Sequence, residues 1–97
     1  MTMILAVKQS NFFKRAVKKL SKQHKARLDE EIKKILENPN LGTRKKGDLD
    51  FLSVHKFSLS NQEYLLGYYY QEDKLVLILL KLGSHENFYR DIKKEIG

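Results

Sequence analysis

Histidine is the residue type in this sequence best suited to proton transfer near neutral pH. His55 stands in the run Ser-Val-His-Lys-Phe, and His85 follows a Gly-Ser pair late in the chain. Imidazole titrates near neutrality, so one ring can accept a proton while another donates one. His55 and His85 could therefore flank a substrate, and two hydrogen-bonded structural histidines explain the pattern equally well. His24, in a lysine-rich segment, is expected to be a solvated surface residue.

Two features near His85 favour a phosphate ligand. If Ser84 caps a helix, the N–H groups at that helix start attract phosphate and disfavour a charged imidazole. Tyr89 lies four residues beyond His85, which places both on one helical face. The tyrosine could stack on a base or hydrogen-bond a phosphate, and simple packing is its alternative role.

The net charge of +7, from 19 Lys and Arg against 12 Asp and Glu, suggests a polyanionic partner. Charge alone does not distinguish RNA, DNA, a ribosome, an anionic membrane or an acidic protein, and a solvated lysine surplus gives the same total. Cations near the histidines could hold an RNA backbone and stabilise charge developing on phosphorus. The candidate phosphate-binding residues are Arg44, Lys45, Lys46, Lys56, Lys81 and Arg90.

Several classes of protein are disfavoured. The chain has no cysteine, so disulfides and thiolate metal sites are absent, which fits a reducing compartment. No P-loop, GxGxxG, HExxH or nucleophile elbow occurs, and neither a metal nor a cofactor is expected. The first residues are too short for a signal sequence and no stretch could span a bilayer, so a cytoplasmic location is expected.

A helical hairpin is predicted in the first half of the single domain, residues 1–97. Ser10 is suited to cap a helix over residues 11–20, and Ser21 to cap a second helix over residues 22–37. Asn38 followed by proline ends the second helix, because the residue before proline avoids the helical region. A short strand over residues 3–7 is expected to precede the hairpin.

Three further strands are predicted over residues 49–59, 64–70 and 74–80, with a C-terminal helix over residues 84–96. Short turns between consecutive strands make them antiparallel. The predicted fold class is α+β, with the N-terminal αα-hairpin packed on a four-stranded antiparallel sheet and a short C-terminal helix. The second sheet face, rich in tyrosine, is expected to form a groove for RNA or another chain.

Over nearly its whole length the sequence resembles the RelE/ParE superfamily of bacterial type II toxins. The resemblance is carried, in order, by FFKRAVKKL, ILENPNLGTRKKGDLDFLSVHKF and YLLGYYYQEDKLVLILLKLGSHENFY. It implies a RelE-like fold similar to small microbial ribonucleases, and a cognate antitoxin that wraps and silences the toxin. RelE-type members cleave mRNA in the ribosomal A site without a metal, by attack of the 2′-hydroxyl on the adjacent phosphate. ParE-type members instead inhibit DNA gyrase and lack the ribonuclease residues.

The match to RelE-type site residues is mixed. Leu65 stands where many of these toxins carry a catalytic arginine, and His85 stands where the family ending has another arginine. The histidine version resembles the YafQ branch, which also has a second-strand histidine that matches His55. Tyr89 aligns with the family's tyrosine. The extension after Tyr89 departs from YafQ and resembles a ParE-like subgroup.

The function expected from these resemblances is that of a metal-independent, ribosome-dependent mRNA endoribonuclease that inhibits translation. His55 and His85 would share the general acid and base work, and Tyr89 would position the nucleotide. The alternative is a ParE-like toxin that binds and inhibits DNA gyrase. A third interpretation is an RNA-binding or antitoxin-buffering module without activity.

Overall fold

The computed structural model describes residues 4–86 and Phe88. Both helices of the hairpin begin at the serines that the sequence suggested as caps. The Ser10 hydroxyl accepts the Phe13 N–H before α1 (Asn11–Lys18), and the Ser21 hydroxyl accepts the His24 N–H before α2 (Lys22–Glu37). The predicted bounds of α2 are confirmed. The first helix ends two residues earlier than predicted. The N–H groups of Lys19 and Leu20 donate to carbonyls three residues earlier, in the tighter 3-10 pattern, so the α-helical pattern stops before Ser21.

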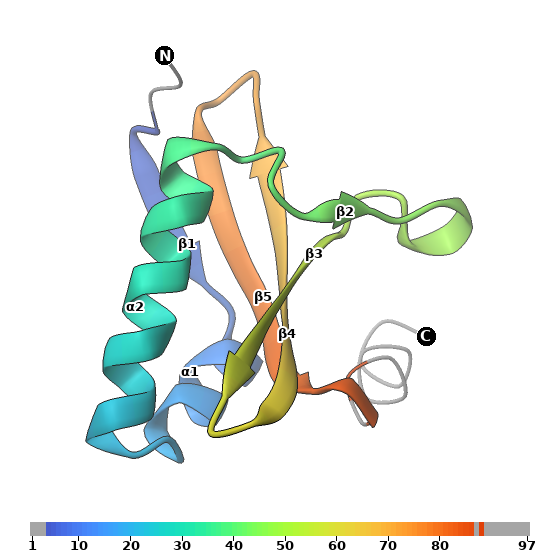
Figure 1. The fold of residues 1–97 in the computed structure, drawn as a ribbon. Helices are drawn as coiled ribbons and strands as arrows, with labels where there is room; N and C mark the ends of the chain where they lie inside the picture. Colours follow the sequence, from blue (N-terminus) through green and yellow to red (C-terminus); the bar gives the residue numbers. More distant parts are fainter. Residues whose placement is uncertain (1–3, 87, 89–97) are drawn as a thin grey trace.

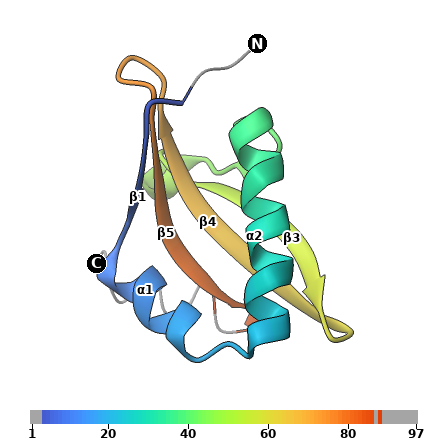
Figure 2. The same cartoon turned by 90° about the vertical axis from the view of Figure 1, so that its left-hand side faces the viewer.

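Within the described part of the chain, the sheet has five strands, not the four antiparallel strands predicted. Their order is β1-β5-β4-β3-β2, and β1 pairs in parallel with β5 while the other pairs are antiparallel. The bounds are β1 (Ala6–Gln9), β2 (Thr43–Arg44), β3 (Ser53–Leu59), β4 (Gln62–Gln71) and β5 (Val76–Ser84). Figure 1 and Figure 2 show β1 at the outer edge of the sheet, with α2 lying across one face and α1 at one end.

Strand β5 continues past the glycine that was expected to end it. Gly83 pairs with Leu65 and Ser84 with Tyr64, so β4 holds the chain extended to residue 84. Ser84 is the last residue of the strand, and the described residues that follow it, His85, Glu86 and Phe88, are helical, so a helix begins where the sequence predicted it. Most of the predicted C-terminal helix, 84–96, lies outside the described residues.

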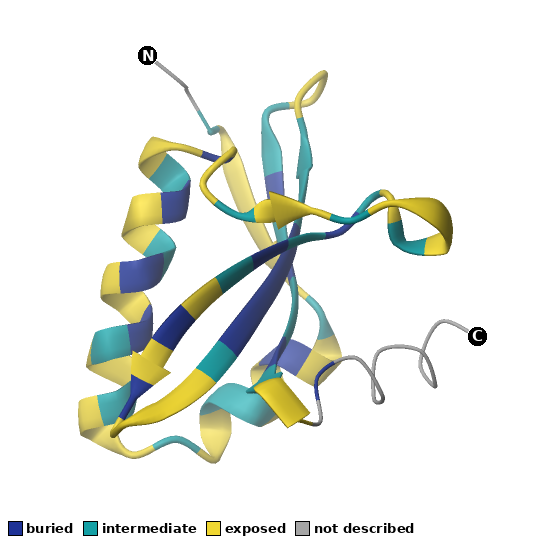
Figure 3. Ribbon diagram, turned by 45° about the vertical axis from the view of Figure 1, so that its right-hand side comes forward, coloured by how far each residue is buried: buried dark blue, intermediate teal, exposed yellow. Residues whose placement is uncertain are grey.

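Residues 49–52, predicted as the start of the strand over residues 49–59, belong instead to a protruding loop between α2 and β3. It contains β2 and the 3-10 turn η1 (Gly47–Leu49), and Gly47 permits the turn with a φ of 74°. The loop is fastened at its base, where the Arg44 side chain donates to the Asp50 carbonyl and the Lys45 N–H to the Leu52 carbonyl, both over 2.8 Å. Figure 3 shows this loop as mostly exposed, beside the buried centre of the sheet.

The two sheet faces bury separate apolar clusters. On the helix side, Phe13, Leu28 and Ile35 pack against residues of β3, β4 and β5. On the other side, Phe88 packs on Leu52, Val54 and Leu65. No helix among the described residues is long and apolar enough to cross a membrane.

Among the described residues, the tyrosines of β4 do not gather on the second face as was expected. Tyr68 is fully buried on the helix side, where its hydroxyl donates to the Pro39 carbonyl and accepts the Gly42 N–H. Tyr70 packs against the same helix-side cluster. Alternation along β4 places Tyr64, Tyr68 and Tyr70 on the side of the helices, so Tyr69 alone of the strand's tyrosines faces away, in contact with Phe51.

Replacing Gly67 with alanine should destabilise the fold by about 1–2 kcal/mol. A Cβ there would lie 2.7 Å from the ring tip of the buried Phe88 and 3.0 Å from Leu52. The matched control is Gly83→Ala in the neighbouring strand, whose Cβ would meet nothing nearer than 3.9 Å. Urea unfolding of both variants measures the effect, and equal midpoints would show that Phe88 does not fill the space above Gly67.

Candidate functional site

His55 lies in the middle of β3 and is directed toward α2. Its Nε2 is 2.7 Å from a carboxylate oxygen of Glu31, and its ring stacks on Phe57 with centroids 6.0 Å apart. The side chain of His55 is 13% exposed and that of Glu31 is 2% exposed. Because an ionised carboxylate can only accept, Nε2 carries a proton and Nδ1 is the basic nitrogen of the neutral ring.

Glu31 is the centre of a charged cluster between α2 and β3. Its second carboxylate oxygen accepts from Lys34 over 2.9 Å and from Arg27. Burial by itself would raise the pKa of Glu31, but the hydrogen bonds from His55 and Lys34 and the charges of Arg27 and Lys34 hold the pKa below its ordinary value. The carboxylate therefore stays ionised near neutral pH and fixes the imidazole in orientation and tautomer.

The sequence carries a signal for this pair that its motifs alone do not reveal. Glu31 lies three residues after Leu28 and four before Ile35, on the stripe that packs against the sheet. A carboxylate on such a stripe needs a cationic or hydrogen-bonding partner, and an inward-facing histidine on a strand can supply one. The spacing within α2 points to burial, but not to which strand lies opposite.

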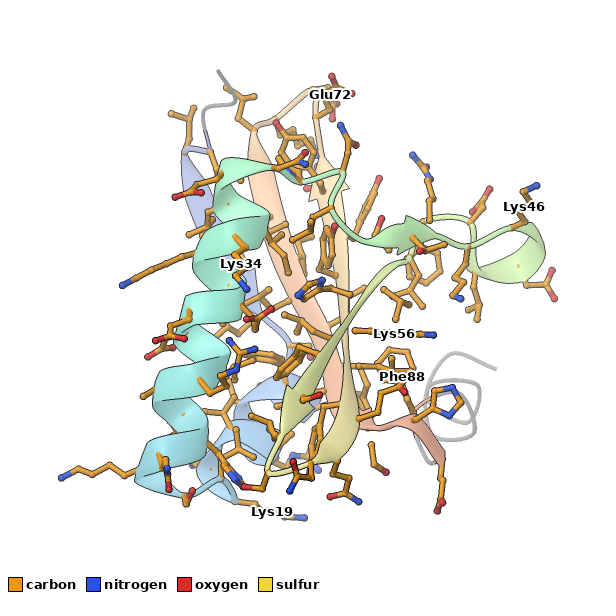
Figure 4. All side chains as sticks on the ribbon, viewed as in Figure 1. Lys19, Lys34, Lys46, Lys56, Glu72 and Phe88 are labelled. Carbon is orange, nitrogen blue, oxygen red and sulfur yellow. The ribbon has the colours of Figure 1, made fainter. Side chains whose placement is uncertain are left out.

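His55 borders a surface depression of about 490 Å³ that also involves two of the predicted phosphate-binding residues. Lys45 comes from the protruding loop and Lys56 from the next position of β3. Strand β2 pairs only with Ser53 and Val54, so the edge of β3 beyond them is not covered by β2. The depression lies at this edge and is lined by Lys45, His55 and Lys56, with His55 directed toward α2 and Lys56 toward the face that carries Phe88 (Figure 4).

His85 lies in different surroundings. It is exposed just beyond β5 and lines a depression of about 210 Å³ with Gln62, Glu63, Ser84 and Glu86. His55 lines none of it, and the structure thus separates the two imidazoles that were expected to flank one phosphodiester. The physical reason is the alternation of β3, which turns His55 toward Glu31 of α2.

The predicted phosphate-binding residues do not form one patch. Figure 4 shows Lys46 at the tip of the protruding loop and Lys56 on the side of the sheet that carries Phe88. Lys56 lies 3.7 Å from Glu63, and the Lys81 ammonium lies 5.4 Å from the centre of the Phe12 ring. Tyr89 and Arg90 lie outside the described residues. Within the described part of the chain, no three His, Cys, Asp or Glu side chains gather closely enough to bind a metal ion.

Comparison with known proteins identifies the class to which this fold belongs. Residues 7–93 match the family model of ParE-like toxins of type II bacterial toxin–antitoxin systems, so the chain belongs to that family. The predicted membership of the RelE/ParE superfamily is confirmed. No curated protein matches the sequence.

Solved structures show the same fold at low sequence identity. A double mutant of the Escherichia coli toxin RelE in the free state aligns over 100% of both chains, with a TM-score of 0.72 and 20% identity. The RelBE2 toxin–antitoxin complex from Mycobacterium tuberculosis gives a TM-score of 0.70 at 15% identity, covering 88% of this chain and 95% of that one. The intact E. coli RelBE complex gives 0.65 at 19% identity, covering 80% of this chain and 93% of that one.

Replacing Glu31 with glutamine should lower the free energy of unfolding by about 1–3 kcal/mol, because three charged or polar donors lose their ionised acceptor. Glu30→Gln is the control, because Glu30 is 67% exposed and its contact with Arg27 is long, at 3.4 Å. The free energy of unfolding of this variant should change by less than about 0.5 kcal/mol. Chemical unfolding at pH 7 measures both.

The pH dependence follows from the sign of the shift. Folding lowers the pKa of Glu31 below its value of about 4 in the unfolded chain. The ionised carboxylate therefore stabilises the fold fully above that unfolded pKa, and this stabilisation is lost as the pH falls through the lower pKa of the folded state. The difference between wild type and Glu31→Gln should therefore shrink on acidification below about pH 4. A difference that stays constant down to about pH 2 would contradict the ionised network.

Proposed function

We propose that this toxin is a metal-independent endoribonuclease that cleaves mRNA on the ribosome, with His55 at its catalytic centre. The observation that carries the proposal is the 2.7 Å contact of His55 with the buried Glu31, beside the depression that Lys45 and Lys56 line. A carboxylate that orients an imidazole next to two cations is an arrangement suited to acid–base chemistry on a phosphodiester. The structural similarity to RelE, at 20% sequence identity, supports the fold that would position these groups.

The proposed reaction needs only groups of the RNA and of this chain. The Nδ1 atom of His55 takes the proton of a ribose 2′-hydroxyl, whose oxygen attacks the adjacent phosphorus. The bond from phosphorus to the 5′ oxygen breaks, leaving a cyclic phosphate, and the ammonium of Lys45 protonates the departing oxygen. Lys45 offsets the negative charge that develops on the phosphate, Lys56 adds positive charge at the rim of the depression, and Glu31 stabilises the imidazolium that forms.

His85 has a different part in the proposal from the one predicted. Its depression is lined by Glu63 and Glu86, two carboxylates that would repel a phosphate. We therefore assign His85 to binding of the ribosome or the antitoxin, and the sequence-based roles of Tyr89 and Arg90 in holding RNA stay predictions. The cognate antitoxin is a proposed partner because solved relatives are complexes with theirs. A ribosomal target implies action in the cytoplasm.

Inhibition of DNA gyrase is the second candidate function, and two observations favour it. The family model that matches is of ParE-like toxins. Leu65, at the position where many RelE-type toxins carry an arginine, is fully buried against the cluster around Phe88 and offers no charge.

His55→Ala should abolish mRNA cleavage, with a loss of at least about 100-fold, because proton transfer by a positioned side chain contributes that much or more. Glu31→Gln should cost roughly 10-fold or more, because it removes the group that orients the ring. Mapping mRNA ends in cells expressing each variant measures both effects. The control is His24→Ala, whose ring contacts Ser60 at the far end of β3.

Three outcomes would decide against this assignment. Full cleavage by His55→Ala with loss in His85→Ala would move the catalytic centre to the end of β5. Intact mRNA together with gyrase-linked DNA breaks would establish the second function. Cleavage that Glu31→Gln reduces only in proportion to the amount of folded protein would make Glu31 a structural residue alone.

A further inference from the structure

A groove of about 520 Å³ separates α1 from the ends of β4 and β5, on a part of the surface that the proposed reaction does not use. Hydrogen bonds fix its two walls relative to each other. The Ser10 hydroxyl donates to the Leu80 carbonyl while accepting the Phe13 N–H, and the Ser10 N–H donates to the Leu79 carbonyl over 2.9 Å. Ser10, the residue that caps α1, thus also attaches the helix to β5. The relative position of the two walls of the groove is therefore fixed by the fold.

The groove is cationic. Arg15 comes from α1, Lys19 is the residue directly after it, and Lys81 comes from β5; no Asp or Glu occurs among the described residues that line the groove. Neighbouring cations repel one another, and this repulsion is relieved when an anion binds between them. The lining therefore favours a negatively charged ligand.

Phe12 holds two of these cations in place. The guanidinium carbon of Arg15 lies 5.2 Å from the centre of the ring, and the Lys81 ammonium lies 5.4 Å from it. Phe12 is 40% exposed, so the ring also displaces water beside the charges. Cations held over a ring keep their N–H donors directed to the solvent edge, where a phosphate can accept them.

We infer that this groove binds the phosphate backbone of RNA, as an anchoring site separate from the depression beside His55. The identity of the ligand rests on the proposed function. The polar side chains of Gln62 and Ser84 can bond a ribose or a base edge, and the ring of Tyr64 offers a stacking surface. Binding through phosphates makes the site independent of base sequence.

The test measures RNA binding without requiring cleavage. The probe is a fluorescein-labelled decauridylate with every 2′-hydroxyl methylated, titrated with the full-length toxin and followed by fluorescence anisotropy. Arg15→Glu with Lys19→Glu should weaken binding at least about tenfold and flatten the salt dependence by about 0.7 for each phosphate that the protein no longer neutralises. Phe12→Leu should weaken it by roughly threefold, because the ring no longer holds the cations.

The matched control changes the same charge elsewhere on the hairpin. Lys25 and Lys33 are exposed on α2 and do not line the groove, so Lys25→Glu with Lys33→Glu should weaken binding less than about threefold. An equal loss of affinity for the RNA probe in the two double variants would contradict the proposed site. So would displacement of the RNA from wild type by an equal concentration of a deca-glutamate peptide, which would mark the groove as a site for an acidic protein segment.

Failure of the inference can be told apart from failure of the proposed function. If wild type leaves mRNA intact but the groove variants selectively lose the probe, the groove is an RNA site on a toxin with another activity. If His55→Ala abolishes cleavage while the groove variants bind the probe and cleave as wild type does, the nuclease stands and the groove is not an RNA site. An anchoring role further predicts a raised KM with kcat retained in the groove variants.

Discussion

A carboxylate buried between a helix and a strand organises the side of this molecule where chemistry is proposed. Removing the charge of Glu31 from water is costly, and the donors on His55, Lys34 and Arg27 offset that cost. A well-packed apolar pair at the same place could stabilise the fold as well. What the ionised pair adds is a fixed ring orientation and a fixed tautomer beside Lys45 and Lys56, which an apolar pair cannot supply.

Local signals predicted the helices well and the sheet only in part. The bounds of α2 could be predicted because Ser21 and Asn38 act within a few residues of the helix ends. The pairing of β1 with β5 joins segments about 70 residues apart, and no local pattern encodes it. Gly83 suggested a strand end, but pairing with Leu65 overrides the weak preference of one residue.

The candidate site was predictable as a set of residues but not as an arrangement. Histidines and lysines with suitable chemistry can be identified from their types alone, and Lys45, His55 and Lys56 do meet at one depression. Which face each side chain takes depends on strand register, and this decides that His55 contacts Glu31 while His85 lies elsewhere. The groove beside Phe12 could not be predicted from the sequence, since it exists only where α1 meets β5.

The parallel pairing of the first strand with the last has a consequence for how the toxin comes into being. Ala6 pairs with Val76, and the Ser10 hydroxyl donates to the Leu80 carbonyl. The edge of the sheet and the attachment of α1 to β5 therefore both need residues that lie 70 positions further along the chain. Contacts of such long sequence separation form late and slowly. A nascent chain can form the pairing of β3 with β4 before β5 is synthesised, but the edge pairing of β1 and the attachment of α1 have to wait for β5.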